Sequence, residues 1–177
     1  MLGVPTLIFQ RVRTHSAALF LCLLALAPAV YMGVRVAEAS RDIAYWDEFD
    51  TALNFILQID QGIGVRDFFG RLFAISNEHR MVTSRLMFAS SYWLTGTVDF
   101  SVISWLGNLS LFALCGLLVW TAGTAARRLR MALVLAMLMF QLEHYENFLW
   151  SGSSIDHFQV VLRAGLAVGG VARGTRA

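Results

Sequence analysis

Residues 100–126 read FSVISWLGNLSLFALCGLLVWTAGTAA, a stretch of 27 residues without a charge. As an α-helix this stretch would be about 40 Å long, which exceeds the ~30 Å hydrocarbon core of a bilayer. A second uncharged stretch, residues 17–34, would reach about 27 Å as a helix, and its Pro28 is tolerated in a membrane. The two stretches therefore predict membrane-spanning helices.

A cleaved signal peptide is the alternative interpretation of residues 17–34, because Ala37-Glu38-Ala39 resembles a cleavage site. The apolar region of a signal peptide is shorter, about 7–15 residues. We therefore expect a retained membrane helix.

The composition also favours a membrane protein. Hydrophobic residues make up 57% of the chain and charged residues 15%, whereas soluble domains average about 45–50% and about 25%. The net charge is only +2 and no basic run is interleaved with aromatic residues, so we expect no nucleic-acid partner. All 14 basic residues are Arg, which together with abundant Ala, Leu and Gly is typical of a GC-rich bacterial genome.

The arginines next to the apolar stretches predict the orientation in the membrane. Positively charged residues favour the cytoplasmic side. Here they cluster before residue 17 and after residue 126, at Arg11, Arg13, Arg127, Arg128 and Arg130. We expect a multi-pass protein of the bacterial cytoplasmic (inner) membrane with a cytoplasmic N-terminus, so that the loop over residues 35–97 is external.

The C-terminal part of the sequence predicts further helices. An apolar run from residue 131 is too short to cross a bilayer, so a helix over residues 130–150 would have to continue past Glu143 and Glu146 to Trp150. Residues 151–154, Ser-Gly-Ser-Ser, indicate an external turn, and residues 155–172 allow a fourth helix.

The predicted fold is an all-α polytopic membrane protein, one membrane domain over residues 1–177 with three to four transmembrane helices. These are residues 17–34, 98–123, 130–150 and possibly 155–172. Apolar residues at helical spacing near residues 49–57 and 81–88 predict two amphipathic helices in the first external loop, on the membrane surface. Gly62 and Gly64 follow the first of these helices, and Asn77 is the expected N-cap of the second.

Several polar clusters are candidates for chemistry. Asp47 and Glu48, shortly after the first membrane helix, can accept a proton from a hydroxyl or hold a divalent cation. Arg80 can bind phosphate oxygens, and His79 beside it titrates near neutral pH. The alternative for both clusters is a solvated loop and a capped surface helix.

Two further clusters lie in the C-terminal part. Glu143, His144, Glu146 and Asn147 would stand near the outer end of a membrane helix, where burying ionisable groups needs a functional reason. Asp156-His157 follows at the same expected depth, with an ordinary structural role as its alternative.

The order and spacing of these motifs resemble the GT-C superfamily of glycosyltransferases, multi-spanning enzymes that take sugars from polyprenyl-phosphate carriers. The resemblance rests on Trp46-Asp47-Glu48, on Asn77-Glu78-His79-Arg80 and on Glu146-Asn147-Phe148-Leu149-Trp150, and Ser76 departs from the family pattern. It also extends to a group of poorly characterised bacterial membrane proteins.

The resemblance implies particular roles. Asp47 or Glu48 would act as catalytic base or help to hold a divalent metal, whose use the resemblance leaves open. Arg80 would suit the carrier phosphate, Glu143 or Glu146 would line the substrate cavity, and Glu78, His79 and Asn147 complete the implied substrate-binding set.

Superfamily members have more helices than this sequence, so we expect it to be the N-terminal piece of such an enzyme, inactive when isolated. The alternatives are a small membrane accessory or flippase-like protein for polyprenyl-linked sugars, and a membrane scaffold without catalysis. The 63-residue external loop with its clustered acids argues against the accessory protein, because such proteins have short loops.

Overall fold

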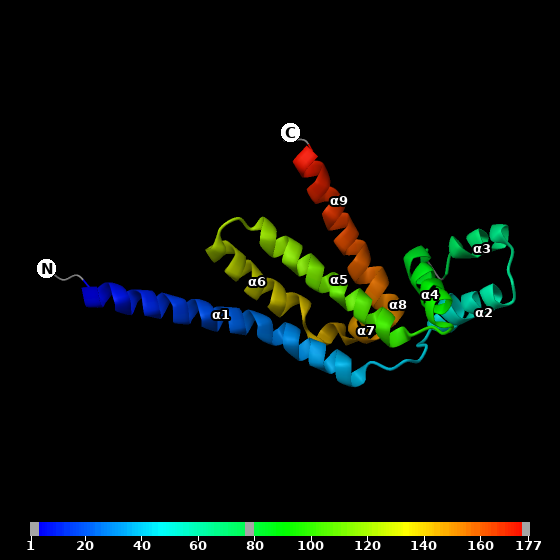
Figure 1. Cartoon of the computed structure of the whole chain (residues 1–177), viewed down its shortest axis with the longest axis horizontal. Helices are drawn as coiled ribbons and strands as arrows, with labels where there is room; N and C mark the ends of the chain where they lie inside the picture. The colour runs from blue at the N-terminus through cyan, green and yellow to red at the C-terminus, as the bar shows by residue number, and fades with distance from the viewer. Residues whose placement is uncertain (1–3, 77–79, 175–177) are drawn as a thin grey trace. The chain divides into compact units, whose positions relative to one another are not determined.

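The computed structural model describes residues 4–76 and 80–174, and every regular element in these ranges is a helix (Figure 1). The prediction of an all-α protein is thus confirmed for this part of the chain. The chain forms two compact units. One unit is drawn from residues 1–38 and 115–144, and the other from residues 39–114 and 145–177.

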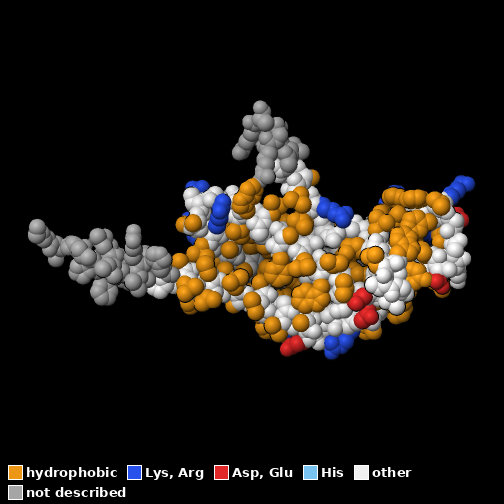
Figure 2. Space-filling model, viewed as in Figure 1, with side chains coloured by type: hydrophobic (Ala, Val, Ile, Leu, Met, Phe, Trp, Pro, Cys, Tyr) orange, Lys and Arg blue, Asp and Glu red, His pale blue; other side chains and the backbone are white. Residues whose placement is uncertain are grey.

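Two of the described helices are long and apolar enough to cross a membrane. Helix α1 runs over Val4–Ala39, and an 18-residue window within its segment Ser16–Ala39 has a mean hydropathy of 2.2. Helix α5 runs over Phe100–Thr121, and an 18-residue window within it has a mean hydropathy of 2.0. Apolar side chains are exposed along residues 16–39 of α1 and along α5. Figure 2 shows many apolar side chains on one face of the described part of the chain. Such exposure is typical of helices that face lipid.

In the first unit the chain turns at Gly123, between the end of α5 and the next helix. Gly123 adopts a left-handed φ of 77°, which only glycine enters without strain. Helix α6, Ala125–Met139, then begins where the Thr124 side chain accepts a hydrogen bond from the Arg127 backbone N–H.

The prediction of one helix over residues 130–150 is wrong. Helix α6 ends at Met139, because the backbone of Phe140 leaves the helical region with φ −103° and ψ 64°. The chain continues as a short 3₁₀ helix, η2 (Leu142–His144), and as helix α7 (Tyr145–Leu149). Glu143 and Glu146 therefore do not share one continuous helix face.

The prediction of a turn at the Ser-Gly-Ser-Ser segment is also wrong. It forms helix α8, Ser151–Ser154, and its residues are all buried. The helical path then continues through the π-helix η3, Ile155–Gln159, into helix α9, Val160–Gly174.

The first loop holds more helix than the sequence predicted. A π-helix, η1 (Phe49–Leu53), leads into helix α2 (Asn54–Asp60), which Gly62 follows with a left-handed φ of 80°. Helix α3, Val65–Leu72, was not predicted. The buried Arg85 guanidinium donates to Arg71 O, in the last turn of α3, at 3.0 Å, and to Ala74 O, just after the helix, at 2.6 Å.

Helix α4 runs over Val82–Thr95. The prediction of Asn77 as its N-cap is wrong, because Met81 occupies that position. Residues 77–79, with the expected ligands Glu78 and His79, lie outside the described residues.

The core of the second unit is formed by side chains from η1, α2, α3, α4, α5 and η3. Its buried hydrophobic residues are Ala52, Phe55, Ile56, Leu72, Phe88, Ala89, Phe100, Ile103 and Ile155. Helix α5 approaches α8 closely, since a Cβ added to Gly107 would lie 2.1 Å from Ser154 Oγ and 2.7 Å from its backbone carbon. Close approach of helices through small residues is common in membrane proteins.

Candidate functional site

The first half of the candidate site is the loop between α1 and η1. Trp46 has a φ of 51°, the one non-glycine residue with positive φ in the described chain. Such a conformation is strained for a bulky residue. It is held by a tight turn, in which Glu48 N–H donates to Tyr45 O at 3.0 Å and Tyr45 N–H donates to Glu48 Oε2 at 2.8 Å. The turn orients the acidic residues that follow.

Glu48 joins this loop to helix α8. Its side chain is 1% exposed. Oε1 accepts a hydrogen bond from Gly152 N–H at 2.8 Å and another from the Ser151 hydroxyl. Burial raises the pKa of Glu48, and the hydrogen bonds from Ser151 and Gly152 partly oppose that rise. Because its oxygens are engaged by protein donors, Glu48 suits a positioning role better than that of a base.

Asp47 occupies a different environment from its neighbour. It is half-buried and lines a cavity of about 370 Å³ together with Arg80, Asp156 and His157. The remaining lining residues are Ser76, Met81, Trp150, Ser153 and Val160. Burial raises the pKa of Asp47, its own backbone N–H lowers it, and repulsion from Asp50 raises it further. A carboxylate with a raised pKa beside a cavity is suited to proton transfer.

His157 belongs to a hydrogen-bonded chain on the cavity wall. Its Nδ1 lies 2.8 Å from Ser153 O, an acceptor, so this geometry assigns the ring proton to Nδ1. In the neutral ring Nε2 then keeps its lone pair. The Ser153 hydroxyl donates to Asn147 Oδ1 at 2.6 Å, which links Asn147 to the same wall.

Asp156 is the second carboxylate of this cavity. Ser84 Oγ on α4 donates to its Oδ1 at 2.5 Å. Asp156 therefore connects η3 to α4, and it lines the same cavity as Arg80.

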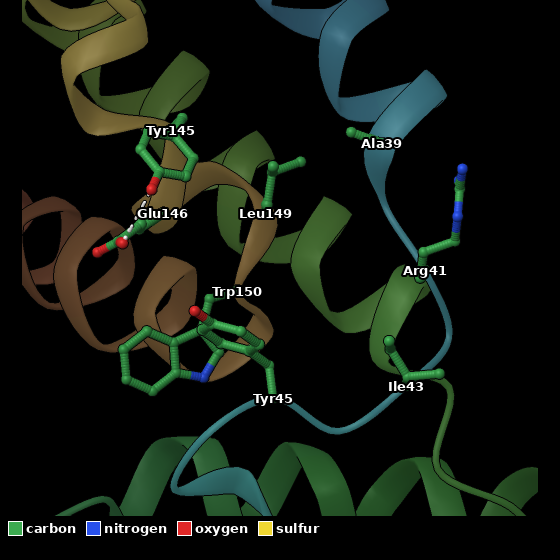
Figure 3. A pocket seen from close by; sticks show the side chains of 8 residues that line it. All are labelled: Ala39, Arg41, Ile43, Tyr45, Tyr145, Glu146, Leu149 and Trp150. Atoms are coloured by element: carbon green, nitrogen blue, oxygen red, sulfur yellow. Dashed lines mark hydrogen bonds between the residues drawn. The ribbon is translucent and has the colours of Figure 1, made fainter.

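Three aromatic side chains, Tyr45, Trp46 and Trp150, pack against one another, and Trp150 lines the cavity of Asp47. The rings of Trp46 and Trp150 are stacked, with centroids 6.1 Å apart and planes 15° apart. Tyr45 meets Trp150 edge to face at 6.0 Å. Trp150 also lines a second cavity, of about 230 Å³. Glu146 and Arg41 line this cavity too (Figure 3).

The structure brings together only some of the residues predicted from the sequence. Asp47 and Arg80 line one cavity, and Asn147 reaches its wall through Ser153. Glu146 is exposed and lines the second cavity instead. Glu143 is exposed in η2, which belongs to the other unit.

Sequence reasoning missed the role of Ser151 and Gly152 as the buried partners of Glu48, since small polar residues indicate a turn as readily as a tight helix contact. It also gave Asp156-His157 little weight. The run of Ser and Gly directly before Asp156 was the available signal.

In the described part of the chain, no group of three or more His, Cys, Asp and Glu side chains is close enough to hold a metal ion. Comparison with protein-family models, with curated proteins and with solved structures finds no match for this chain.

Proposed function

We propose that this chain contributes the donor and acceptor site of a membrane-embedded glycosyltransferase of the GT-C type. In this proposal α1 and α5 cross the bacterial inner membrane, the N-terminus is cytoplasmic, and the loop between them faces the extracytoplasmic side. The donor is a sugar carried on a polyprenyl phosphate, and the acceptor is a hydroxyl group.

One observation carries the proposal: Asp47 and Arg80, distant in sequence, line the same cavity. The negatively charged phosphate of the polyprenyl carrier needs a cation beside it. A guanidinium suits this role, because it can bind two phosphate oxygens at once. The acceptor hydroxyl needs a group that takes its proton. A half-buried carboxylate and an exposed arginine at one cavity supply both requirements.

The proposed reaction is a single displacement. The acceptor oxygen attacks the anomeric carbon while its proton passes to an Asp47 carboxylate oxygen. The bond between the anomeric carbon and the phosphate oxygen breaks, and the electron pair remains on the departing polyprenyl phosphate, whose charge Arg80 stabilises. His157 Nε2 offers a second acceptor on the wall, and Glu48 acts as a positioning residue that fixes the Asp47 loop to α8.

The test is binding of undecaprenyl phosphate to the purified chain in detergent micelles. Arg80→Gln removes the guanidinium and should weaken binding about tenfold or more, because hydrogen bonds to charged groups contribute about 1.5–3 kcal/mol. Arg66→Gln, which removes an exposed arginine of α3, is the matched control and should leave binding unchanged.

Asp47→Asn separates binding from chemistry. It should keep or strengthen the affinity for undecaprenyl phosphate, because it removes a negative charge beside the phosphate. Where membranes that contain this chain transfer sugar, the Asp47→Asn substitution should abolish the transfer. Equal affinities of Arg80→Gln and Arg66→Gln would contradict the site and would favour a scaffold without catalysis.

A further inference from the structure

The indole N–H of Trp150 is a buried donor at the cavity of Asp47 and Arg80. Trp150 lines that cavity, and its Nε1 atom has no hydrogen-bond partner among the described residues. Buried indole N–H groups usually have an acceptor, because an unsatisfied buried donor is unfavourable. The proposed reaction leaves this group unused, which points to an acceptor that a ligand supplies.

The position of this N–H follows from the space beside Gly152. A Cβ added to Gly152 would lie 3.4 Å from Trp150 Nε1. The same Cβ would lie 3.5 Å from Glu48 Oε1 and 3.6 Å from Met81 Cε. In the sequence, Glu48 directly follows the proposed proton acceptor, and Met81 directly follows the proposed phosphate ligand. The indole nitrogen therefore lies close to both segments that carry the proposed chemistry.

Aromatic contacts hold the indole ring in place. The Trp46 ring stacks on it with the two planes 15° apart, and Tyr45 meets it edge to face (Figure 3). Trp46 has the strained φ of 51°, and such strain clusters at ligand sites. A ring fixed in this way is preorganised, so little entropy is lost when its N–H binds a ligand.

We infer that Trp150 Nε1–H donates a hydrogen bond to an oxygen atom of the ligand in this cavity, so that Trp150 is a binding residue of the site. The inference rests on the proposed function, whose donor carries two kinds of acceptor, the phosphate oxygens and the sugar hydroxyls. Both accept a hydrogen bond from an indole N–H. A sugar hydroxyl can also donate to a carboxylate such as that of Asp156, which lines the same cavity.

The experiment follows the indole N–H signals in NMR spectra of the purified, ¹⁵N-labelled chain in detergent micelles. The chain has five tryptophans, and Trp150→Phe identifies the signal of Trp150. Undecaprenyl phosphate or its glucosyl, galactosyl or mannosyl derivative should move this signal downfield. A shift with undecaprenyl phosphate itself assigns the acceptor to the phosphate, and a shift that needs a sugar assigns it to a hydroxyl. The signal of Trp93, an exposed residue of α4, should stay in place.

A second variant removes the N–H and keeps the ring. In benzothienylalanine, placed at position 150, sulfur replaces the indole N–H. Binding of the lipid that moves the signal should weaken about tenfold. The free energy of unfolding of the ligand-free chain should not fall, because the N–H has no partner among the described residues. The same replacement at Trp93 is the matched control and should leave binding unchanged.

The outcomes separate this inference from the proposed function. Binding that Arg80→Gln weakens, with a stationary Trp150 signal and equal affinity of the benzothienylalanine variant, would overturn the inference alone and assign the N–H to water. A shifted Trp150 signal with no effect of Arg80→Gln would support the inference and contradict the proposed phosphate site. No binding of any of these lipids would overturn both.

Discussion

The Glu48 carboxylate accepts a hydrogen bond of 2.8 Å from the backbone N–H of Gly152, a residue 104 positions later in the chain. Through this bond the loop that carries Asp47 is fixed to the helix that leads to Asp156 and His157. The two residues thus hold together the two sides of the candidate site.

Glu48→Gln should lower the free energy of unfolding by about 1–3 kcal/mol. Both carboxylate oxygens of Glu48 accept hydrogen bonds, from Tyr45 N–H on one side and from Ser151 and Gly152 on the other. An amide places N–H donors against one of these groups. Reversible unfolding in detergent micelles measures the change. Asp50→Asn, at an exposed acid of η1, should change the free energy of unfolding by less than about 0.5 kcal/mol.

Stability should depend on pH through Glu48. Burial raises its pKa in the folded chain above the ordinary value of 4.5. Between that value and the raised pKa, the folded state binds more protons than the unfolded state, so stability falls as pH rises. Below the ordinary value this contribution is fully present. Unfolding measured across this window should show the slope in the wild-type chain and a smaller slope in Glu48→Gln; identical slopes would refute the assignment.

Gly107→Ala should destabilise the second unit by about 1–3 kcal/mol. The new Cβ would lie 2.7 Å from the backbone carbon of Ser154, so α5 and α8 would have to separate. Gly116→Ala on the same helix is the control, because an added Cβ there has no neighbour within 4 Å. The control should be neutral or slightly stabilising, since alanine favours helices. The same unfolding measurement distinguishes them.

Trp46 allows a test of backbone strain. Both Trp46→Gly and Trp46→Ala lose the stacking on Trp150, but only glycine accepts a φ of 51° without a steric cost. The glycine variant should therefore be more stable than the alanine variant by about 0.5–1 kcal/mol. Greater stability of the alanine variant would indicate that the loop does not hold this conformation.

The helical class and the two long apolar helices could be predicted from the sequence, because uncharged runs such as residues 100–126 depend only on local composition. The break after Met139 could not, since α6 ends with neither a proline nor a glycine at Phe140. Helix α3 was missed because Gly70 interrupts its short apolar pattern.

The site was predictable only in part, for a physical reason. Asp47 and Arg80 are residue types that suggest chemistry, and their common cavity follows from tertiary packing. The partners of Glu48 are a hydroxyl and a backbone N–H in Ser151-Gly152, whose residue types carry no such signal. Burial of Glu48 and exposure of Glu146 likewise depend on packing, so the division of roles among the acids needed the structure.

The most direct test of the account is labelling of a cysteine placed in the Asp47 cavity. Ser76→Cys, on the cavity lining, would be made in a chain whose Cys22 and Cys115 are replaced by Ser. Gln61→Cys, an exposed position in the same loop, is the control.

A membrane-impermeant maleimide should label both cysteines from the outside of intact spheroplasts. Added undecaprenyl phosphate should protect Cys at position 76 and not at position 61. Labelling of position 76 only after the membrane is permeabilised, or labelling that undecaprenyl phosphate does not slow, would contradict the account.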